Sequence, residues 1–75
     1  MRGYRTYPGR PTIHVTPWAD AWFTVHDWAH IRAMVTADAV EIAGRGPFTA
    51  KVGTVQARGA TIRAAVDRLP EEVRR

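Results

Sequence analysis

The stretch that decides the fold runs from Thr54 to Val73 and reads TVQARGATIRAAVDRLPEEV. Its apolar or small residues recur at alternating spacings of four and three, at Val55, Gly59, Ile62, Val66, Leu69 and Val73. This spacing places all six on one stripe of an α-helix. Thr54 is suited to cap that helix, and Pro70 should end or kink it near Leu69 because proline cannot donate to the helical ladder. The stretch therefore predicts one helix laid across a small sheet, with its stripe buried.

The length and composition indicate one small domain outside a membrane. Seventy-five residues bury only a small core, and with no cysteine the chain has neither a disulfide nor a thiolate site. No apolar run approaches the roughly 20 residues of a spanning helix. The basic N-terminal residues are not followed by the apolar segment of a signal peptide. We expect a protein of the cytoplasm, or of a virion built there, without a membrane partner.

The chain is basic, with a net charge of +4, and Lys51 is its only lysine beside ten arginines. Such a charge permits binding to nucleic acid or to an acidic protein surface, but it requires neither. Heavy use of Ala, Arg, Val and Gly also suggests a GC-rich genome, which is a coding bias before it is chemistry.

Residues 1–11 are predicted to form an extended N-terminal arm, with residues 12–75 as the single folded domain. Two glycines and two prolines disfavour a helix in this arm. The residues expected to contact a partner are Tyr4, Arg5, Tyr7 and Arg10. Tyrosine and arginine are favoured between protein subunits, and they can also stack on bases and reach phosphates. We expect the arm to be mobile until a partner orders it, and a frayed tail is the alternative.

Residues 12–28 alternate in polarity and predict a β-hairpin with its turn at 17–20. The predicted core pairing sets Ile13 and Val15 against Phe23 and Val25. The opposite face would then carry His14, Trp22, His26 and Trp28. A sheet covered by one helix leaves its other face open, so we expect Trp22, His26 and Trp28 to bind a partner, unless a loop or the arm covers them.

Residues 29–44 fit two structures. As strands, the segment alternates around Ile31 and Val35 and turns at 36–38 before a second strand. As a helix, it would be capped by Asp27 and would be favoured by its alanines. The β-branched residues and the turn chemistry favour the hairpin.

The following segment is clearer. Gly and Pro at 44–47 predict a turn, and Phe48 to Val52 alternates as a last short strand. Gly53 then separates this strand from the predicted helix.

The residues that could carry chemistry do not form a catalytic pattern. His26 and His30 are four apart in HDWAH, a spacing that could bind a metal on a helix, but no third ligand is indicated. The chain has no serine, and the GRG at 44–46 is too short for a phosphate loop. We therefore expect no enzymatic activity, no cofactor and no metal.

The run FTAKVGTVQARGATIRAAVDRL at residues 48–69 resembles the strand–strand–helix end of HicB-like antitoxin domains. The resemblance is carried by VQAR at 55–58 and by the segment after it. It implies that QAR belongs to a strand and that the helix begins near Thr61. The family's aromatic strand pair and its Pro-Glu-Leu-like turn are missing here, so the resemblance assigns no functional residue.

The sequence thus predicts an α+β fold: a small antiparallel meander of three to five strands, with one C-terminal helix on one face and an extended N-terminal arm. The predicted function is a non-enzymatic interaction or structural module that docks into a larger protein assembly or onto further copies of itself. An accessory virion protein of a phage with a GC-rich host would suit the size and charge. The alternative is a small regulator that binds nucleic acid, of the antitoxin kind.

Overall fold

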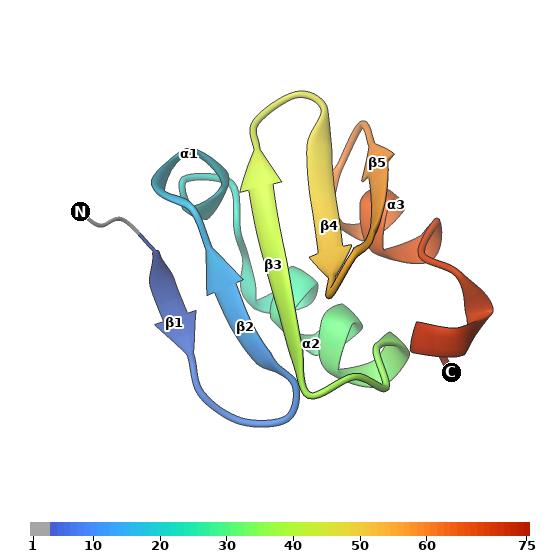
Figure 1. Cartoon of the computed structure of the whole chain (residues 1–75). Helices are drawn as coiled ribbons and strands as arrows, with labels where there is room; N and C mark the ends of the chain where they lie inside the picture. Colours follow the sequence, from blue (N-terminus) through green and yellow to red (C-terminus); the bar gives the residue numbers. More distant parts are fainter. Residues whose placement is uncertain (1–3) are drawn as a thin grey trace.

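The computed structural model describes residues 4–75 and shows a five-stranded sheet with helices behind it (Figure 1). In chain order the elements are β1 (Arg5–Tyr7), β2 (Thr12–Val15), α1 (Pro17–Asp20), α2 (Val25–Met34), β3 (Ala39–Gly44), β4 (Phe48–Val52), β5 (Val55–Gly59), α3 (Ile62–Asp67) and a 3₁₀ turn, η1 (Glu71–Val73). The strands lie in the order β1-β2-β3-β4-β5, so neighbours in sequence are neighbours in the sheet.

The predicted α+β class is confirmed, whereas the purely antiparallel meander with one C-terminal helix is wrong. Strands β2 and β3 are parallel, and the other three pairs are antiparallel. A parallel pair needs a crossover of a dozen or more residues, usually a helix. Here α1 and α2 supply that crossover between Val15 and Ala39.

The hairpin predicted over 12–28 is wrong after its first strand. Pro17 occupies the first turn of α1, where its missing N–H costs no hydrogen bond. Thr24 then caps α2 through a reciprocal capping box with Asp27. Ile13 and Val15 are buried as predicted, but their proposed partner Val25 is exposed at the start of α2.

Residues 29–44 divide between the two predicted structures. The first part is helical, because α2 continues to Met34, so the strand preferred for that part is wrong. The second part is β3, as predicted. The buried side of α2 carries Asp27 and Ile31, four residues apart, and Val35 follows as its C-cap. Because the first residue of this buried stripe is the carboxylate Asp27, the apolar residues alone do not show the helical spacing.

The single long helix predicted from Thr54 is also wrong. Val55–Gly59 is a strand that pairs with β4 around the two residues Gly53 and Thr54. The helix begins only after Thr61, whose hydroxyl accepts a hydrogen bond from the backbone N–H of Ala64 at 3.0 Å. This is the local arrangement that the antitoxin resemblance implied. The strand predicted at Phe48 to Val52 and the turn before it are confirmed.

The core lies between the sheet and the helices α2 and α3. Its buried residues come from every layer and are Ile13, Val15, Ala19, Ile31, Val35, Val40, Ile42, Phe48, Ala50, Ile62, Ala65, Val66 and Leu69. The burial predicted for Ile62, Val66 and Leu69 is therefore confirmed, while Val55 is only half-buried. These side chains supply the main hydrophobic stabilisation.

The face of the sheet that points away from the helices is polar. Strand pairing aligns one row across all five strands, made of Thr6, His14, Glu41, Lys51 and Gln56. The sequence had placed two tryptophans and two histidines on this face. Only His14 of those four lies there, because the other three belong to α2 or to the loop before it.

The predicted arm is largely part of the fold. Arg5–Tyr7 forms β1 and pairs antiparallel with β2, so this part of the predicted extended arm lies in the sheet. The guanidinium of Arg32 on α2 donates to the backbone carbonyls of Pro8 and Arg10. These hydrogen bonds hold the loop between β1 and β2 against α2. Residues 1–3 of the predicted arm lie outside the described residues.

Within residues 4–75, no helix has the length and apolar character needed to cross a bilayer. The C-terminal segment lies beside the end of α2, where the backbone N–H of Arg75 donates to the backbone carbonyl of Met34 at 2.7 Å.

Gly59 ends β5 at the point where the strand meets the first turn of α3. A Cβ at this position would lie 2.5 Å from the backbone nitrogen of Ala65 and 2.7 Å from the carbonyl carbon of Ala64. Backbone atoms cannot move aside as a flexible side chain can. The close approach of β5 to α3 therefore requires glycine here.

We expect Gly59→Ala to destabilise the fold by about 2 kcal/mol or more, as overpacking against backbone does. Gly53→Ala is the control, since Gly53 has φ +61° but open space around it, and it should cost about 1 kcal/mol. Urea unfolding of the two variants measures the difference. Equal costs would show that β5 and α3 are not packed this closely.

Candidate functional site

Four large apolar side chains are exposed around α1 and the start of α2, and we call them the aromatic surface. They are Trp18, Trp22, Val25 and Trp28, with exposed fractions of 64%, 61%, 69% and 38%. Trp18 lies on α1, Trp22 follows its end, and the other two lie on the first turn of α2. On α2 the spacing of three places Val25 and Trp28 on the same side of the helix.

Two arginines lie over the tryptophans of this surface. The guanidinium carbon of Arg45, from the β3–β4 turn, lies 4.4 Å from the ring centroid of Trp18. That of Arg32 lies 4.6 Å from the ring of Trp28. Both distances are those of a cation–π contact, worth about 0.5–1 kcal/mol at exposed sites. The surface thus combines aromatic area with positive charge.

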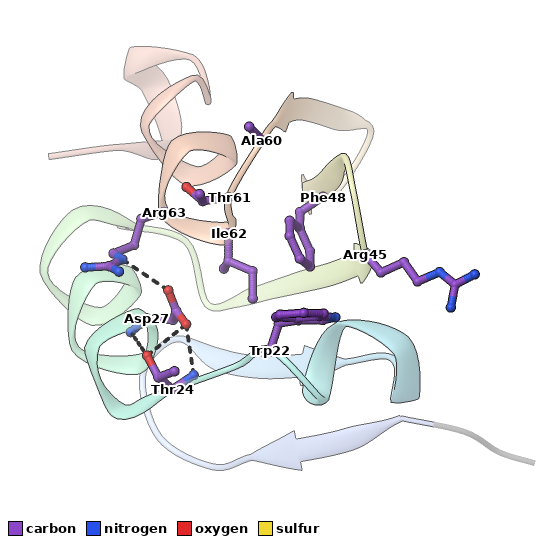
Figure 2. A pocket seen from close by; sticks show the side chains of 9 residues that line it. All are labelled: Trp22, Thr24, Asp27, Arg45, Phe48, Ala60, Thr61, Ile62 and Arg63. Carbon is purple, nitrogen blue, oxygen red and sulfur yellow. Dashed lines mark hydrogen bonds and ion pairs between the residues drawn. The ribbon is translucent and has the colours of Figure 1, made fainter.

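A pocket of about 390 Å³ opens beside Trp22. It lies between the loop before α2, the β3–β4 turn and the start of α3 (Figure 2). Figure 2 shows the side chains of Phe48 and Ile62 pointing toward the indole of Trp22. Phe48 and Ile62 are core residues, so they form a fixed wall, and Trp22 is the exposed one.

The polar side of this pocket is organised by Asp27, a carboxylate that is only 5% exposed. One of its oxygens accepts from the backbone N–H and the hydroxyl of Thr24, at 2.8 and 3.0 Å. The other lies 3.2 Å from Nε of Arg63 on α3. Burying a carboxylate is costly unless it is paired and hydrogen-bonded, and Asp27 meets both conditions.

A second hollow, of about 250 Å³, lies on the other side of Thr24 and is lined by Tyr7, Phe23, Thr24, Val25 and Trp28. The Tyr7 ring packs on Phe23 with centroids 4.9 Å apart, and its hydroxyl donates to Asp20 at 2.7 Å. Burial raises the pKa of the Tyr7 phenol, and the hydrogen bond and negative charge of Asp20 raise it further.

The structure separates the arm residues that the sequence had grouped. Arg5 and Tyr7 both contact Asp20 of α1, on the helical side of the sheet. Tyr4 is exposed and meets the ring of His14 edge-on, with centroids 6.3 Å apart. Arg10 pairs with Asp38 at 2.8 Å, on the exposed loop before β3.

The predicted contact residues Trp22, His26 and Trp28 are all exposed, but they do not share a strand face. Successive helical residues are about 100° apart, so His26 and Trp28 point in nearly opposite directions on α2. Trp22 and Trp28 line two different hollows, and Thr24 is the residue that lines both. Whether these residues bind a partner stays a prediction.

Sequence reasoning missed Trp18, Arg45 and Phe48 as parts of this region. The sequence pattern places Trp18 in a predicted turn, although a proline before it is a common start of a helix. Arg45 and Phe48 reach the region from the β3–β4 turn, so only the tertiary fold brings them there. For Trp18 the proline was such a signal, but no local signal in the sequence could have found Arg45 or Phe48.

The spacing of His26 and His30 does fall on a helix, the condition that the sequence had set for a metal site. His30 is committed to Asp67 of α3, with Nε2 and the carboxylate oxygen 2.6 Å apart. Within residues 4–75, no three acidic or histidine side chains are placed to hold a metal ion.

Comparison with known proteins gave no match: no family model, no curated protein and no solved structure corresponds to this chain.

The raised pKa of Tyr7 predicts a loss of stability at alkaline pH. A phenol whose pKa is higher in the folded than in the unfolded state stabilises the fold fully below about pH 10, and this contribution is lost as the pH rises through the raised value. We expect Tyr7→Phe to reduce this loss between about pH 9 and pH 11. Tyr4→Phe removes an exposed phenol and should behave like the unmodified chain. Equal slopes for all three in urea unfolding would contradict the Tyr7–Asp20 bond.

Proposed function

We propose that this chain is a non-enzymatic interaction module that docks into a larger protein assembly through its aromatic surface. The observation that carries the proposal is the exposure of Trp18, Trp22, Val25 and Trp28 on adjoining segments of one small fold. Exposed apolar side chains scattered singly are ordinary, whereas several large ones on neighbouring segments suggest a contact site. Of the seven contact residues proposed from the sequence, Trp22 and Trp28 belong to it.

The chemistry of the surface is that of a protein interface. Tryptophan and arginine are enriched among the few residues that supply most binding energy. The surface contains three tryptophans, and Arg45 and Arg32 lie over two of them. Stacking holds each guanidinium in place before a partner arrives, so less side-chain entropy is lost on binding.

The core supports this role because it does not use the exposed tryptophans. Its buried side chains come from the sheet, α2 and α3, and α1 adds only Ala19. The tryptophans of α1 and the following loop can therefore be covered by a partner without repacking of the domain. The assembly that we envisage from the size and charge, a phage virion, is part of this proposal.

The nucleic-acid alternative has weaker support. Phosphate binding depends on several cations along one path. Three of the arginines, Arg5, Arg10 and Arg63, each pair with an aspartate of the chain. These pairs neutralise part of the basic charge that the alternative needs, so the protein-binding proposal stands first.

A photo-crosslinking experiment tests the docking surface. The chain would carry p-benzoylphenylalanine in place of Trp22, or in place of Gln56 as the control, in extract of the cells that naturally make the protein. Gln56 is exposed on the polar face of the sheet, away from the aromatic surface. We expect a discrete protein adduct from the position of Trp22 and none from that of Gln56.

Trp18→Ala in the crosslinking chain should reduce this adduct strongly, because hot-spot truncation costs about 2 kcal/mol or more. Circular dichroism should be unchanged, since Trp18 lies outside the core. Adducts at both positions alike, or at neither, would contradict the proposed surface.

A further inference from the structure

The pocket beside Trp22 allows the partner of the aromatic surface to be described chemically, an inference that rests on the proposed function. Its volume of about 390 Å³ falls in the range of roughly 300–1,000 Å³ found for ligand sites. Its apolar wall is made of Trp22, Phe48 and Ile62. The two buried members are fixed by the core, so the pocket is formed before any ligand arrives. A single large apolar side chain is the group that such a space accepts.

The charge around the pocket is positive. Arg45 and Arg63 line it together with one carboxylate, that of Asp27. Figure 2 shows the guanidinium of Arg63 turned toward Asp27 and that of Arg45 pointing outward, away from Trp22 and Phe48. The carboxylate is buried and already pairs with Arg63. Within residues 4–75, Arg45 pairs with no carboxylate, and its guanidinium lies over the ring of Trp18, which is not part of the pocket lining. The charge left to meet a partner is therefore that of Arg45.

The whole chain adds to this local charge, because its net charge is +4. A basic protein attracts anionic partners over distance, and complementary charges raise both the association rate and the specificity. The apolar pocket and the guanidinium at its edge thus demand two features of one ligand. It must present an apolar side chain and carry negative charge beside it.

We propose that this pocket binds one aromatic side chain of an acidic peptide segment, whose neighbouring carboxylates pair with Arg45. The aromatic group enters between Trp22 and the wall of Phe48 and Ile62. An edge-to-face or offset arrangement of aromatic rings is available there, worth about 0.5–1.5 kcal/mol beyond the buried area. A nucleic acid fits less well, because Arg45 is the single unpaired cation among the described residues that line the pocket, and a phosphate chain needs several.

The test uses a defined probe, an acetylated and amidated pentapeptide with a central phenylalanine flanked by four aspartates. Two matched peptides replace the phenylalanine by alanine, or the aspartates by lysines. Titration at millimolar concentration is followed by the indole N–H signals in ¹H–¹⁵N NMR spectra, with Trp22 assigned through Trp22→Phe. We expect the acidic phenylalanine peptide to shift the Trp22 signal in a saturable way. The alanine peptide loses the aromatic ring and the lysine peptide loses the carboxylates, so each should bind at least about fivefold more weakly.

Two variants test whether Arg45 supplies the positive charge that binds the peptide. Arg45→Gln should weaken binding of the acidic peptide by about fivefold, whereas Arg58→Gln, which removes the same charge from the polar face of the sheet, should change it little. Equal effects would mean that only net charge attracts the peptide, and that result would overturn the proposal. So would equal binding of the three peptides, no shift of Trp22 at all, or tighter binding of single-stranded octathymidylate at Trp22.

The two proposals can fail separately. A photo-adduct at Trp22 with no binding of the acidic peptide would refute the acidic aromatic ligand and leave the docking surface standing. Peptide binding without any adduct would support the pocket as a binding site and refute the docking surface as used in the cell.

Discussion

The buried carboxylate of Asp27 is the interaction on which the rest of this structure depends. It closes the capping box of Thr24 and so sets where α2 begins, and it pairs with Arg63 and so holds α2 to α3. Because α2 begins there, the chain crosses over from β2 to β3 and makes that pair parallel. The same carboxylate lies in the wall of the pocket beside Trp22. The Asp27 carboxylate thus takes part in the cap of α2, in the contact between α2 and α3 and in the lining of the candidate site.

The sequence predicted the fold well where local pattern and tertiary environment agree. The turn at 44–47 and the strand from Phe48 follow from glycine, proline and simple alternation, and both are present. The prediction failed where the residue spacing of a segment is typical of an element other than the one it forms. Alternation over 22–28 favoured a strand, but a capping threonine three residues before an aspartate begins a helix there. The stripe from Thr54 had a helical spacing because Gly59, required by close packing, was counted as one of its small residues.

The candidate site was predictable only in part. The sequence predicted exposed tryptophans because one helix cannot cover both faces of a sheet. Trp22 and Trp28 are exposed, although they lie on α2 and the loop before it and not on the sheet. The pocket could not be predicted, because its walls come from three segments far apart in sequence. The place of the arm in the sheet could not be predicted for a similar reason: the Tyr7 hydroxyl donates to Asp20 of α1, a contact that no local pattern reveals.

The most direct test of this account is a double-mutant cycle on Asp27 and Arg63, measured as free energies of unfolding in urea. Asp27→Asn keeps an oxygen that can accept from Thr24, so it retains the cap while removing the charge that faces α3. The account predicts that Arg63→Gln costs about 1 kcal/mol or more in the original chain, and much less when combined with Asp27→Asn. Strictly additive costs would show that the pair does not join the two helices and would contradict the account.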